Sequence, residues 1–322
     1  MPGPLISVVM PVRDGEVFLE EAIASIRAQT LRDLEILVVD DGSRDGTMAI
    51  LRRHAAEDPR LRIVAQPPSG IAVALNRGIG EATAPLIARM DADDIAKPHR
   101  LATQLEALNR HPAVAALGSA YEVIDPSGRI RRRVQLPTSP SEISKLLETS
   151  NCIAHPTVVM RREAVTAVGG YRQAFLKCED YDLWLRLDEK AELLNLEESL
   201  LLYREHSGQE TWWNVEQRIL SELGAKQLAL RRRGGLADPI ESGGPITREC
   251  LRALGLADAT ISEQIVVRAL AAAAEARVAS DPRAAWATFR LALRQRRLSM
   301  LETARFWRAC AGALAGRVVD SD

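Results

Sequence analysis

The stretch IARMDADDIA, residues 87–96, places three carboxylates in four positions, at Asp91, Asp93 and Asp94. They follow an apolar run, residues 85–88, that predicts a short buried strand. Like charges so close together repel one another, and at least one would normally bind a proton. The Asp-x-Asp spacing can instead hold a hard cation such as Mg²⁺ or Mn²⁺ together with ligand oxygens. We therefore expect a divalent metal that carries a diphosphate, and an exposed acidic turn is the simpler alternative.

A second acidic cluster lies in VVDDGSRDGT, residues 38–47, where Asp40 and Asp41 end a predicted strand. A carboxylate at this place can accept the imide N–H of a uracil or the hydroxyls of a ribose. Asp and Ser residues also form turns and cap helices, and this explains the stretch equally well. The cluster alone does not decide between the two interpretations.

Two further segments carry groups that could do chemistry. CEDYDLWLRL opens a predicted helix with Glu179 and Asp180. Acids are favoured at a helix N-terminus by the helix dipole, so capping alone explains the pair, but one of them could also deprotonate a hydroxyl as a general base. His206, in LYREHSGQET, lies just past the last strand signal, where a loop could reach back to the metal. A lone histidine more often has no such role.

The elements that must position these residues alternate along the first part of the chain. Three apolar runs predict strands and three segments with helical spacing predict helices: 5–10, 17–29, 34–41, 61–66, 71–82 and 98–110. Near-continuous apolar strands separated by helices indicate an α/β fold with a mostly parallel, Rossmann-like sheet covered on both faces. Ligands of such sheets bind outside the carboxyl ends of the strands. Both acidic clusters follow such ends.

The pattern changes beyond residue 110. We expect a strand and a turn over 114–130, a strand over 154–162 and a helix over 178–190. From about residue 212 only helical patterns occur, interrupted by a loop over 234–245. We therefore place a domain boundary near 210, between an α/β domain of residues 1–210 and an all-helical region of residues 211–322.

Composition narrows the class of protein. The chain has 322 residues, a formal net charge of −1 and only 4% aromatic residues, so nothing indicates a nucleic-acid partner. Its four cysteines are scattered without a CxxC pair, which fits reduced thiols in the cytoplasm. The N-terminus lacks the features of a signal peptide, and no apolar run approaches the ~20 residues of a membrane span. We expect a soluble cytoplasmic protein, at most peripheral to the inner face of a membrane.

The C-terminal tail is strongly basic. Between Arg283 and Arg317 it carries eight arginines and one acid, a net charge of +7. A helix is expected over 280–297. Its apolar face contains Trp286, Phe289 and Leu293. Its basic face contains Arg290, Arg294 and Arg297. Such a helix could lie on an anionic membrane surface. Because its apolar positions are mostly alanine, we favour packing of residues 283–317 on the catalytic domain or on a second subunit.

The ordered set of motifs resembles glycosyltransferase family 2, which has the GT-A fold. The resemblance covers about residues 5–211 and depends on five segments: SVVMPVRDGEVFLEEAIASIRAQT, EILVVDDGSRDGT, GIAVALNRGIGEATAPLIARMDADD, HPTVVMRREAV with GGYR, and EDYDLWLRL. It implies inverting transfer of one sugar from a nucleoside-diphosphate sugar, with a UDP-sugar as the expected donor. The Gln-x-x-Arg-Trp motif of processive relatives is absent, so the resemblance is to the non-processive members.

The resemblance also implies a role for each candidate residue. The residues that it places around the donor nucleotide are Pro11, Val12, Arg13, Asp41 and Asp91. Those that it places at a divalent metal, Mn²⁺ or Mg²⁺, are Asp93 as the ligand, Asp91 beside it, and His206 from a loop that often closes over the diphosphate. Asp180 would be the catalytic base, with Glu179 next to it. The acceptor would be a glycan, a lipid-linked molecule or a protein in the synthesis of cell-surface polysaccharide, glycolipid or glycoconjugate.

Three other functions are weighed against this one. A nucleotidyltransferase would need a Gly-rich loop with basic residues after its first strand, and PVRDGEVF has one Gly and no Lys. A haloacid-dehalogenase-type phosphatase would carry its Asp-x-Asp pair on its first strand, not about ninety residues into the chain. A non-catalytic sugar-nucleotide-binding module differs from the enzyme only by lacking a base such as the Glu179–Asp180 pair.

Overall fold

The structure is a computed structural model that describes residues 3–206, 214–240, 244–278 and 282–295. The chain divides into two compact units. The first comprises Met1–Gln173 and Glu179–His206, and the second comprises Ala174–Cys178 and Ser207–Asp322. All candidate site residues belong to the first unit.

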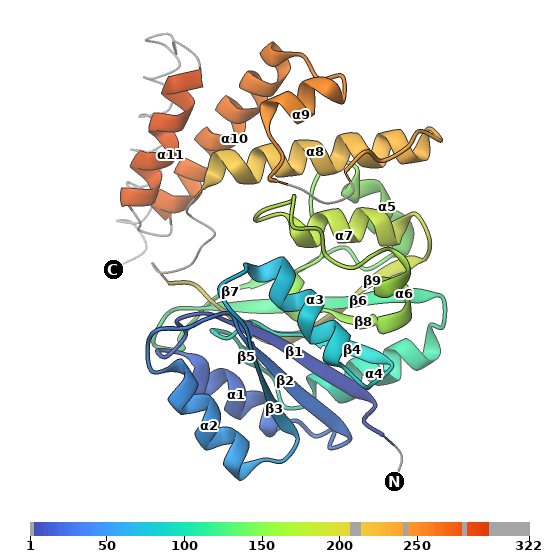
Figure 1. Cartoon of the computed structure of the whole chain (residues 1–322), viewed down its shortest axis with the longest axis vertical. Helices are drawn as coiled ribbons and strands as arrows, with labels where there is room; N and C mark the ends of the chain where they lie inside the picture. The colour runs from blue at the N-terminus through green and yellow to red at the C-terminus, as the bar shows by residue number, and fades with distance from the viewer. Residues whose placement is uncertain (1–2, 207–213, 241–243, 279–281, 296–322) are drawn as a thin grey trace, which may run out of the picture. The chain divides into compact units, whose positions relative to one another are not determined.

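The first unit is built on a single nine-stranded sheet (Figure 1). Its strands are β1 (Ile6–Val12), β2 (Leu34–Asp40), β3 (Leu61–Ala65), β4 (Leu86–Arg89), β5 (Ile95–Ala96), β6 (Val114–Ile124), β7 (Ile130–Val134), β8 (Val159–Arg161) and β9 (Glu192–Arg204). They lie in the order β3-β2-β1-β4-β8-β6-β9-β5, with β7 paired to β6. The expected α/β class is confirmed.

The helices of this unit connect the strands. They are α1 (Leu19–Arg27), α2 (Thr47–Glu57), α3 (Ile71–Glu81), α4 (Arg100–Arg110), α5 (Pro140–Leu147), α6 (Arg162–Ala167) and α7 (Glu179–Asp188), with a short 3₁₀ helix η1 (His155–Thr157). The sequence pattern did not predict α2, α5 or α6. A 3₁₀ turn with Pro156 also replaces the first part of the strand expected over 154–162, because proline supplies no backbone N–H for a strand ladder.

The sheet is mixed rather than mostly parallel. Strands β3, β2, β1 and β4 form a parallel set, but β8 runs antiparallel to both β4 and β6. Strand β9 pairs parallel with β6 and antiparallel with β5. The expectation of a mostly parallel sheet therefore holds for the first four strands and for the pair β6 and β9.

Apolar residues alternate between the two faces of the parallel strands. Val8 and Met10 of β1 belong to the large core cluster that also contains apolar residues of α1, α2 and α4. On the opposite face Val39 of β2 packs with Ala74 of α3. A Cβ on Gly78 of α3 would lie 2.4 Å from Val9, so a glycine at this position allows α3 to pack closely on β1. Helices on both faces leave the carboxyl ends of the strands as the place for a site.

The second unit, as far as it is described, is helical. It contains α8 (Val215–Arg233), α9 (Arg248–Ala253), α10 (Asp258–Val278) and α11 (Pro282–Gln295). None of the helices in the described part of the chain combines the length and apolarity that a membrane span needs. Cys152, Cys178 and Cys250 are free thiols, as expected, and Cys310 lies outside the described residues.

Helix α11 packs on α10 through small residues, with Val266 and Ala269 of α10 clustering against Ala292. Phe289 is buried, but Trp286 is 45% exposed, with the Arg290 guanidinium 5.6 Å from its ring centre. Trp286 and Phe289 share one face of α11, as predicted, with 5.8 Å between their ring centres, but Trp286 lies at the exposed edge of that face. The side chains of Leu293 and Arg297 lie outside the described residues.

Candidate active site

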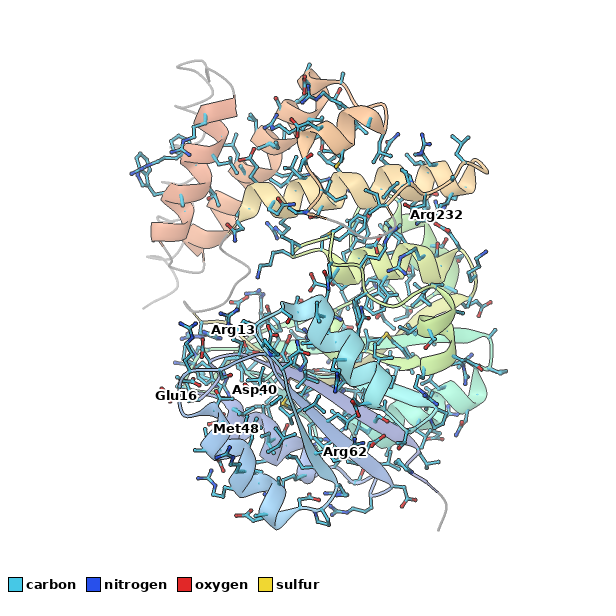
Figure 2. The ribbon with its side chains drawn as sticks, viewed as in Figure 1. Arg13, Glu16, Asp40, Met48, Arg62 and Arg232 are labelled. Carbon is cyan, nitrogen blue, oxygen red and sulfur yellow. The ribbon has the colours of Figure 1, made fainter. Side chains whose placement is uncertain are left out.

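The sheet order brings three strand ends together. Strand β1 lies between β2 and β4, so the chain leaves the sheet at Val12, Asp40 and Arg89 along one edge. The backbone N–H of Asp41 donates to the carbonyl of Val12 at 2.9 Å, which joins the first two ends. Figure 2 shows Arg13 and Asp40 at this edge. The two acidic clusters, far apart in the sequence, thus belong to one edge of the sheet.

Asp41 binds the loop that leads into α3. Its carboxylate accepts hydrogen bonds from the Gln66 side chain at 2.8 Å, the Ser69 backbone N–H at 2.8 Å and the Gly70 backbone N–H at 2.9 Å. Gly70 has a φ of +90°, in the region that favours glycine. Asp41 therefore fixes the start of α3, and its Oδ2, which takes one of these three bonds, keeps the capacity to accept another.

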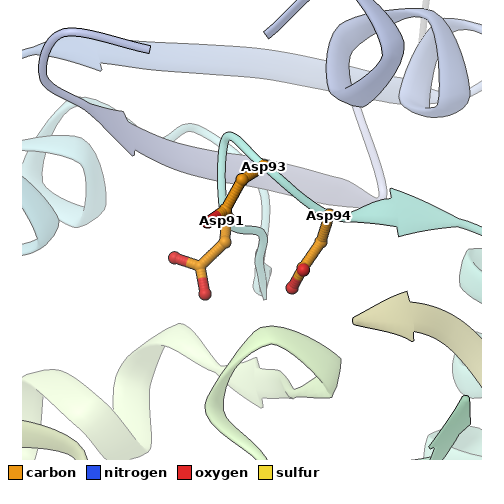
Figure 3. Close-up of side chains that lie close together, drawn as sticks. All are labelled: Asp91, Asp93 and Asp94. Atoms are coloured by element: carbon orange, nitrogen blue, oxygen red, sulfur yellow. The ribbon is translucent and has the colours of Figure 1, made fainter. Parts of the chain in front are cut away.

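The three aspartates after β4 converge (Figure 3). One carboxylate oxygen from each of Asp91, Asp93 and Asp94 lies within 4.8 Å of the others. Asp91 forms an ion pair with Arg89, which is buried beneath it. Asp93 meets His206 Nε2 at 3.0 Å. The segment that the sequence marked as a metal site therefore holds a compact group of oxygen ligands.

Burial and mutual repulsion disfavour ionisation of this cluster in the free protein. Burial, together with the neighbouring charge of Asp93, raises the pKa of Asp91, although Arg89 opposes the shift. Burial also raises the pKa of Asp94 well above its usual value, and Asp93 and Asp91 add to that effect. Asp94 Oδ2 is buried without a hydrogen-bond partner among the described residues. Three oxygen ligands with one unsatisfied atom fit a hard divalent cation.

Arg204, at the end of β9, holds the loop of Asp91, Asp93 and Asp94 in place. Its backbone N–H donates to Asp94 Oδ1 at 2.9 Å and its Nε donates to the Asp93 carbonyl at 2.9 Å. The guanidinium also lies 4.6 Å from the ring centre of Phe18. The His206 ring packs against the same phenyl group, with 4.8 Å between ring centres. Strand β9 thereby positions both the aspartate loop and the histidine that faces it.

Asp180 stands at the second residue of α7. Its Oδ2 accepts a hydrogen bond from the Asn151 side chain at 2.8 Å, and its Oδ1 accepts one from the Tyr181 backbone N–H at 2.7 Å. Burial raises the pKa of Asp180, although these bonds oppose the shift. The negative charge of Asp180 in turn contributes to the raised pKa of Asp91. The two carboxylates therefore interact electrostatically. Glu179 is buried beside it.

This architecture has known counterparts. Residues 7–169, half of the chain, match the model of Glycosyl transferase family 2. The chain belongs to this family. The O-antigen biosynthesis glycosyltransferase WbnJ of Escherichia coli is 31% identical over 207 residues, which are 63% of this chain and 80% of that protein. The amylovoran biosynthesis glycosyltransferase AmsE of Erwinia amylovora is 35% identical over 170 residues, 52% of this chain and 63% of that protein.

Solved structures support the same fold. S. aureus TarS 1–349 in complex with UDP-GlcNAc aligns with a TM-score of 0.56 at 14% identity, over 88% of this chain and 90% of that one. The mannosyltransferase PcManGT of Pyrobaculum calidifontis, in complex with GDP-Man and Mn²⁺, aligns with a TM-score of 0.56 at 19% identity, over 100% of this chain and 89% of that one. The family 2 chain is thus a glycosyltransferase enzyme with the GT-A fold. This assignment decides against the nucleotidyltransferase and the phosphatase.

The residues expected to line a nucleotide pocket in this family 2 enzyme differ in exposure. Val12 is 4% exposed and its side chain belongs to the core, so only its backbone can face a ligand. Pro11 is half-buried. The Arg13 side chain is 51% exposed and lies 4.0 Å from the carboxylate of Asp14. Of the three, Arg13 alone offers an exposed charged group at this edge.

Sequence reasoning missed three residues of the site. Arg89 and Arg204 left a detectable signal, because each is a charged residue in an apolar strand, LIAR and LLLYR, and a buried charge needs a partner. Asn151 left none, since a single asparagine in a loop is most often a turn residue. Its contact with Asp180 depends on the three-dimensional fold.

Proposed function

We propose that this enzyme is an inverting, metal-dependent glycosyltransferase that moves one sugar from a nucleoside-diphosphate sugar to an acceptor hydroxyl. The observation that carries the proposal is the Asp91–Asp93–Asp94 cluster at the carboxyl edge of the sheet, together with the Asp180 carboxylate, whose charge contributes to the raised pKa of Asp91. A single displacement at a sugar carbon requires a cation near the leaving group and a general base near the attacking hydroxyl.

The donor is assigned by analogy with relatives of the same fold. TarS was solved with UDP-GlcNAc and PcManGT with GDP-Man and Mn²⁺, and these ligands are properties of those proteins. For this chain we propose a UDP-sugar as the donor, with its uracil ring near Asp41 and the backbone of Pro11 and Val12. Asp41 Oδ2 takes one hydrogen bond, from Gly70, and can accept another from an imide N–H.

The metal would be held by Asp93, with Asp91 beside it and His206 closing the loop from the far side. When bound, a divalent cation supplies positive charge that offsets the negative charge growing on the departing diphosphate. Asp94 Oδ2, which is buried without a hydrogen-bond partner among the described residues, would then have a positive charge nearby. Arg89 pairs with Asp91 and reduces repulsion within the cluster.

Asp180 acts as the base in this proposal. Its carboxylate takes the proton of the acceptor hydroxyl as that oxygen attacks the anomeric carbon, opposite the bond to the diphosphate. Attack from the opposite face inverts the configuration at that carbon. The raised pKa of Asp180 makes it a better proton acceptor than an ordinary aspartate. Glu179 lies next to it as the alternative base.

The biological setting is proposed from the relatives. WbnJ acts in O-antigen biosynthesis and AmsE in amylovoran biosynthesis. We place this enzyme in the synthesis of a cell-surface polysaccharide, glycolipid or glycoconjugate, as a non-processive transferase that acts on a glycan, a lipid-linked molecule or a protein. Residues 1–210 are the proposed catalytic domain, and residues 211–322 the helical one.

The C-terminal domain adds a proposal on location. Arg290 and Arg294 are exposed on α11, and the segment 283–317 carries the net charge of +7. We propose either homo-oligomerisation through this segment or peripheral contact with the inner face of the cytoplasmic membrane. Co-sedimentation with anionic vesicles that weakens with salt, and with both arginines changed to Gln, supports the membrane contact. Absence of binding at low salt would leave the segment as a structural or oligomerising element, and light scattering then measures the oligomeric state.

A nucleotide panel tests the main proposal. Nucleoside diphosphates are screened by thermal shift with and without Mn²⁺, and the corresponding sugar nucleotides are then assayed for hydrolysis and transfer. A ligand at a hundredfold excess over its Kd adds about 2.7 kcal/mol to the free energy of unfolding. We expect UDP to stabilise the protein only with the metal. Nucleotide binding without any turnover would instead support a binding module.

A further inference from the structure

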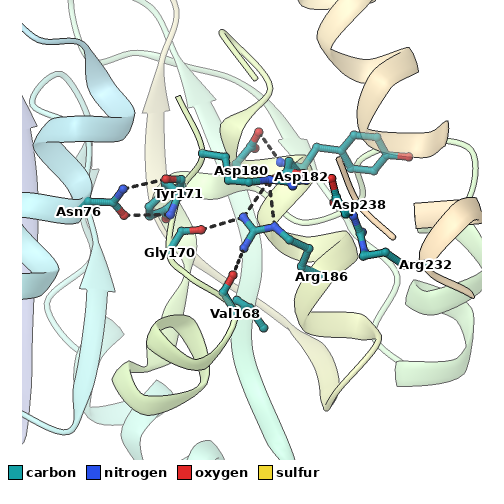
Figure 4. Close-up of polar contacts among 11 residues, drawn as sticks. Asn76, Val168, Gly170, Tyr171, Asp180, Asp182, Arg186, Arg232 and Asp238 are labelled. Atoms are coloured by element: carbon teal, nitrogen blue, oxygen red, sulfur yellow. Dashed lines mark hydrogen bonds and ion pairs between the residues drawn. The ribbon is translucent and has the colours of Figure 1, made fainter. Parts of the chain in front are cut away.

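The segment Val168–Arg172 lies between α3 and α7 and is bonded to both (Figure 4). On the α3 side, Asn76 Nδ2 donates to the Tyr171 carbonyl at 2.7 Å, and Asn76 Oδ1 accepts from the Tyr171 N–H at 2.8 Å. Both ends of one amide are thus used on one residue of the segment, and this fixes the orientation of the Asn76 side chain.

On the α7 side, Arg186 reaches two carbonyls of the same segment. Its guanidinium donates to Val168 O at 2.6 Å and to Gly170 O at 2.7 Å. Arg186 is held in place by Asp182, one turn earlier on α7, and Asp182 also pairs with Arg172 at the end of the segment. Asp182 is fully buried, so its two arginines are the groups that offset its charge.

Gly170 is required for this arrangement. Its φ is +69°, and a Cβ at this position would lie 2.5 Å from Asn76 Oδ1. A side chain here would therefore be strained in its own backbone and would collide with the asparagine. The GGYR motif thus permits the close approach of α3 to this segment.

The two helices joined in this way begin at opposite parts of the site. Helix α3 begins after Gly70, whose N–H is bound by Asp41, the residue proposed to face the nucleotide base. Helix α7 begins with Glu179 and Asp180, the proposed base. The chain of contacts from Asp41 through α3, Asn76, Val168–Arg172 and Arg186 to α7 is continuous. Nothing else in the proposed mechanism uses Asn76.

We propose that Asn76 is a positioning residue, which transmits the placement of α3 by the bound nucleotide to the carboxylate of Asp180. The proposal deepens the proposed function and depends on it for the role of Asp180. Asn76 lies in the middle of α3 and acts on the reaction only through the segment and α7. Its removal should therefore slow the chemical step and leave donor binding almost unchanged.

The variant Asn76→Ala is compared with Arg77→Ala, an exposed neighbour on the same helix whose side chain forms an ion pair with Glu81. With UDP-sugar and Mn²⁺, we expect kcat to fall at least about 10-fold in Asn76→Ala, while the Kd for UDP stays within about 2-fold. Arg77→Ala should keep the parent kcat. An equal loss of kcat in both variants would show a general effect of α3 stability and overturn the proposal.

A double variant separates positioning from a merely structural role. In an Asp180→Asn background, Asn76→Ala should cause no further loss of the residual rate, because the group on which it acts is gone. A full additional loss would mean that Asn76 acts by another route. Gly170→Ala should reproduce the kinetic pattern of Asn76→Ala, since it displaces the same amide.

Amide hydrogen exchange tests the link without turnover. In the free protein, exchange over residues 168–187 should be faster in Asn76→Ala than in Arg77→Ala. With UDP and Mn²⁺ the parent should gain protection over both 66–75 and 179–187, and Asn76→Ala over 66–75 only. Unchanged exchange over 168–187 in the free variant contradicts the link. Absence of any nucleotide effect in the parent contradicts the proposed function instead, and the free-protein comparison still decides on the link.

Discussion

Glu35 and Asp94 are both buried carboxylates of one sheet, but they lie at its opposite ends. Glu35 is the second residue of β2, at the amino edge, and Asp94 follows β4 at the carboxyl edge. Glu35 Oε1 accepts hydrogen bonds from the Ser7 hydroxyl at 2.5 Å, the Thr83 N–H at 2.6 Å and the Thr83 hydroxyl at 2.7 Å. For Asp94 the hydrogen bond found among the described residues is that from the Arg204 N–H, at 2.9 Å.

The two pKa values shift in opposite directions for this reason. Burial raises the pKa of Glu35, but the bonds from Ser7 and Thr83 outweigh burial and the net effect is a lowered pKa. At Asp94 burial is reinforced by the charges of Asp91 and Asp93, and the net effect is a strongly raised pKa. Burial is common to both, so the supply of donors and the sign of neighbouring charges distinguish a structural carboxylate from a ligand site.

The first prediction tests Asp180, the proposed general base. Asp180→Asn keeps the shape of the side chain but cannot take a proton, so kcat for sugar transfer should fall by about 10²–10⁴-fold. Donor affinity should barely change, because Asp180 contacts the acceptor in the proposed reaction. Single-turnover assays with saturating UDP-sugar and Mn²⁺ measure this. A near-normal kcat would assign the role to another carboxylate, with Glu179 as the first to examine.

The next effect concerns the cation. Asp93→Ala removes the oxygen that faces His206 and should abolish transfer. It should also remove the stabilisation of about 2.7 kcal/mol that a hundredfold excess of nucleotide adds with Mn²⁺. Thermal shift with UDP, in Mn²⁺ and in chelator, measures the loss of stabilisation, and an assay of sugar transfer measures the loss of activity. Normal turnover of the variant in chelator would show that the cluster is not a metal site.

Glu35→Gln tests the opposite edge of the sheet. An amide there would place its NH₂ among groups that donate, so the free energy of unfolding should fall by about 1–3 kcal/mol at pH 7. Because the folded pKa of Glu35 is lowered, its contribution is present above its ordinary pKa of 4.5 and is lost as pH falls through the folded value. Urea unfolding at pH 7 and pH 4 should therefore show a smaller difference at pH 4.

Kinetics on the same variant complete this test. Glu35 belongs to the amino edge, so Glu35→Gln should keep the kcat and the nucleotide Kd of the parent when assayed below its Tm. Glu106→Gln, on an exposed carboxylate of α4, serves as the stability control and should change little. A loss of kcat in folded Glu35→Gln would contradict the division of the sheet into a structural edge and a catalytic edge.

The sequence predicted the parts of the site that are local. Asp91, Asp93 and Asp94 are adjacent in the chain and follow an apolar run, so their convergence needed no tertiary information. The meeting of His206 with Asp93, by contrast, depends on β9 lying beside β5. Family resemblance implied a place for His206 at the metal, but no spacing rule predicted its contact with Asp93. The bond between Asn151 and Asp180 had neither kind of signal.

The fold shows the same division. Near-continuous apolar runs predicted β1 to β4, and helical spacing of apolar residues predicted α1, α3 and α4, all within a few residues of their observed bounds. The antiparallel pairing of β8 was not predicted, because strand direction is set by long-range connections rather than by local pattern. Helical spacing also placed Trp286 and Phe289 on one face of α11, but spacing alone does not tell which part of a face is buried.

The last prediction concerns Asp94, where the effect is smaller and of opposite sign to that at Glu35. Asp94→Asn keeps an oxygen for the Arg204 N–H and turns an NH₂ toward the neighbouring carboxylates. Without metal, this replaces a buried carboxyl group, whose ionisation Asp91 and Asp93 disfavour, by a neutral amide, and we expect the free energy of unfolding to rise by roughly 1 kcal/mol. In the presence of Mn²⁺ and UDP the gain should disappear, because the neutral amide weakens the cation site.

Thermal unfolding of parent and variant, in chelator and in Mn²⁺ with UDP, measures the difference in stability under each condition. Ser7→Ala, which removes a hydrogen-bond donor from Glu35, is the matched control and should destabilise the protein in both buffers. If Asp94→Asn were destabilised in chelator as Ser7→Ala is, Asp94 would be a satisfied structural carboxylate, and the contrast between the two edges of the sheet would fail.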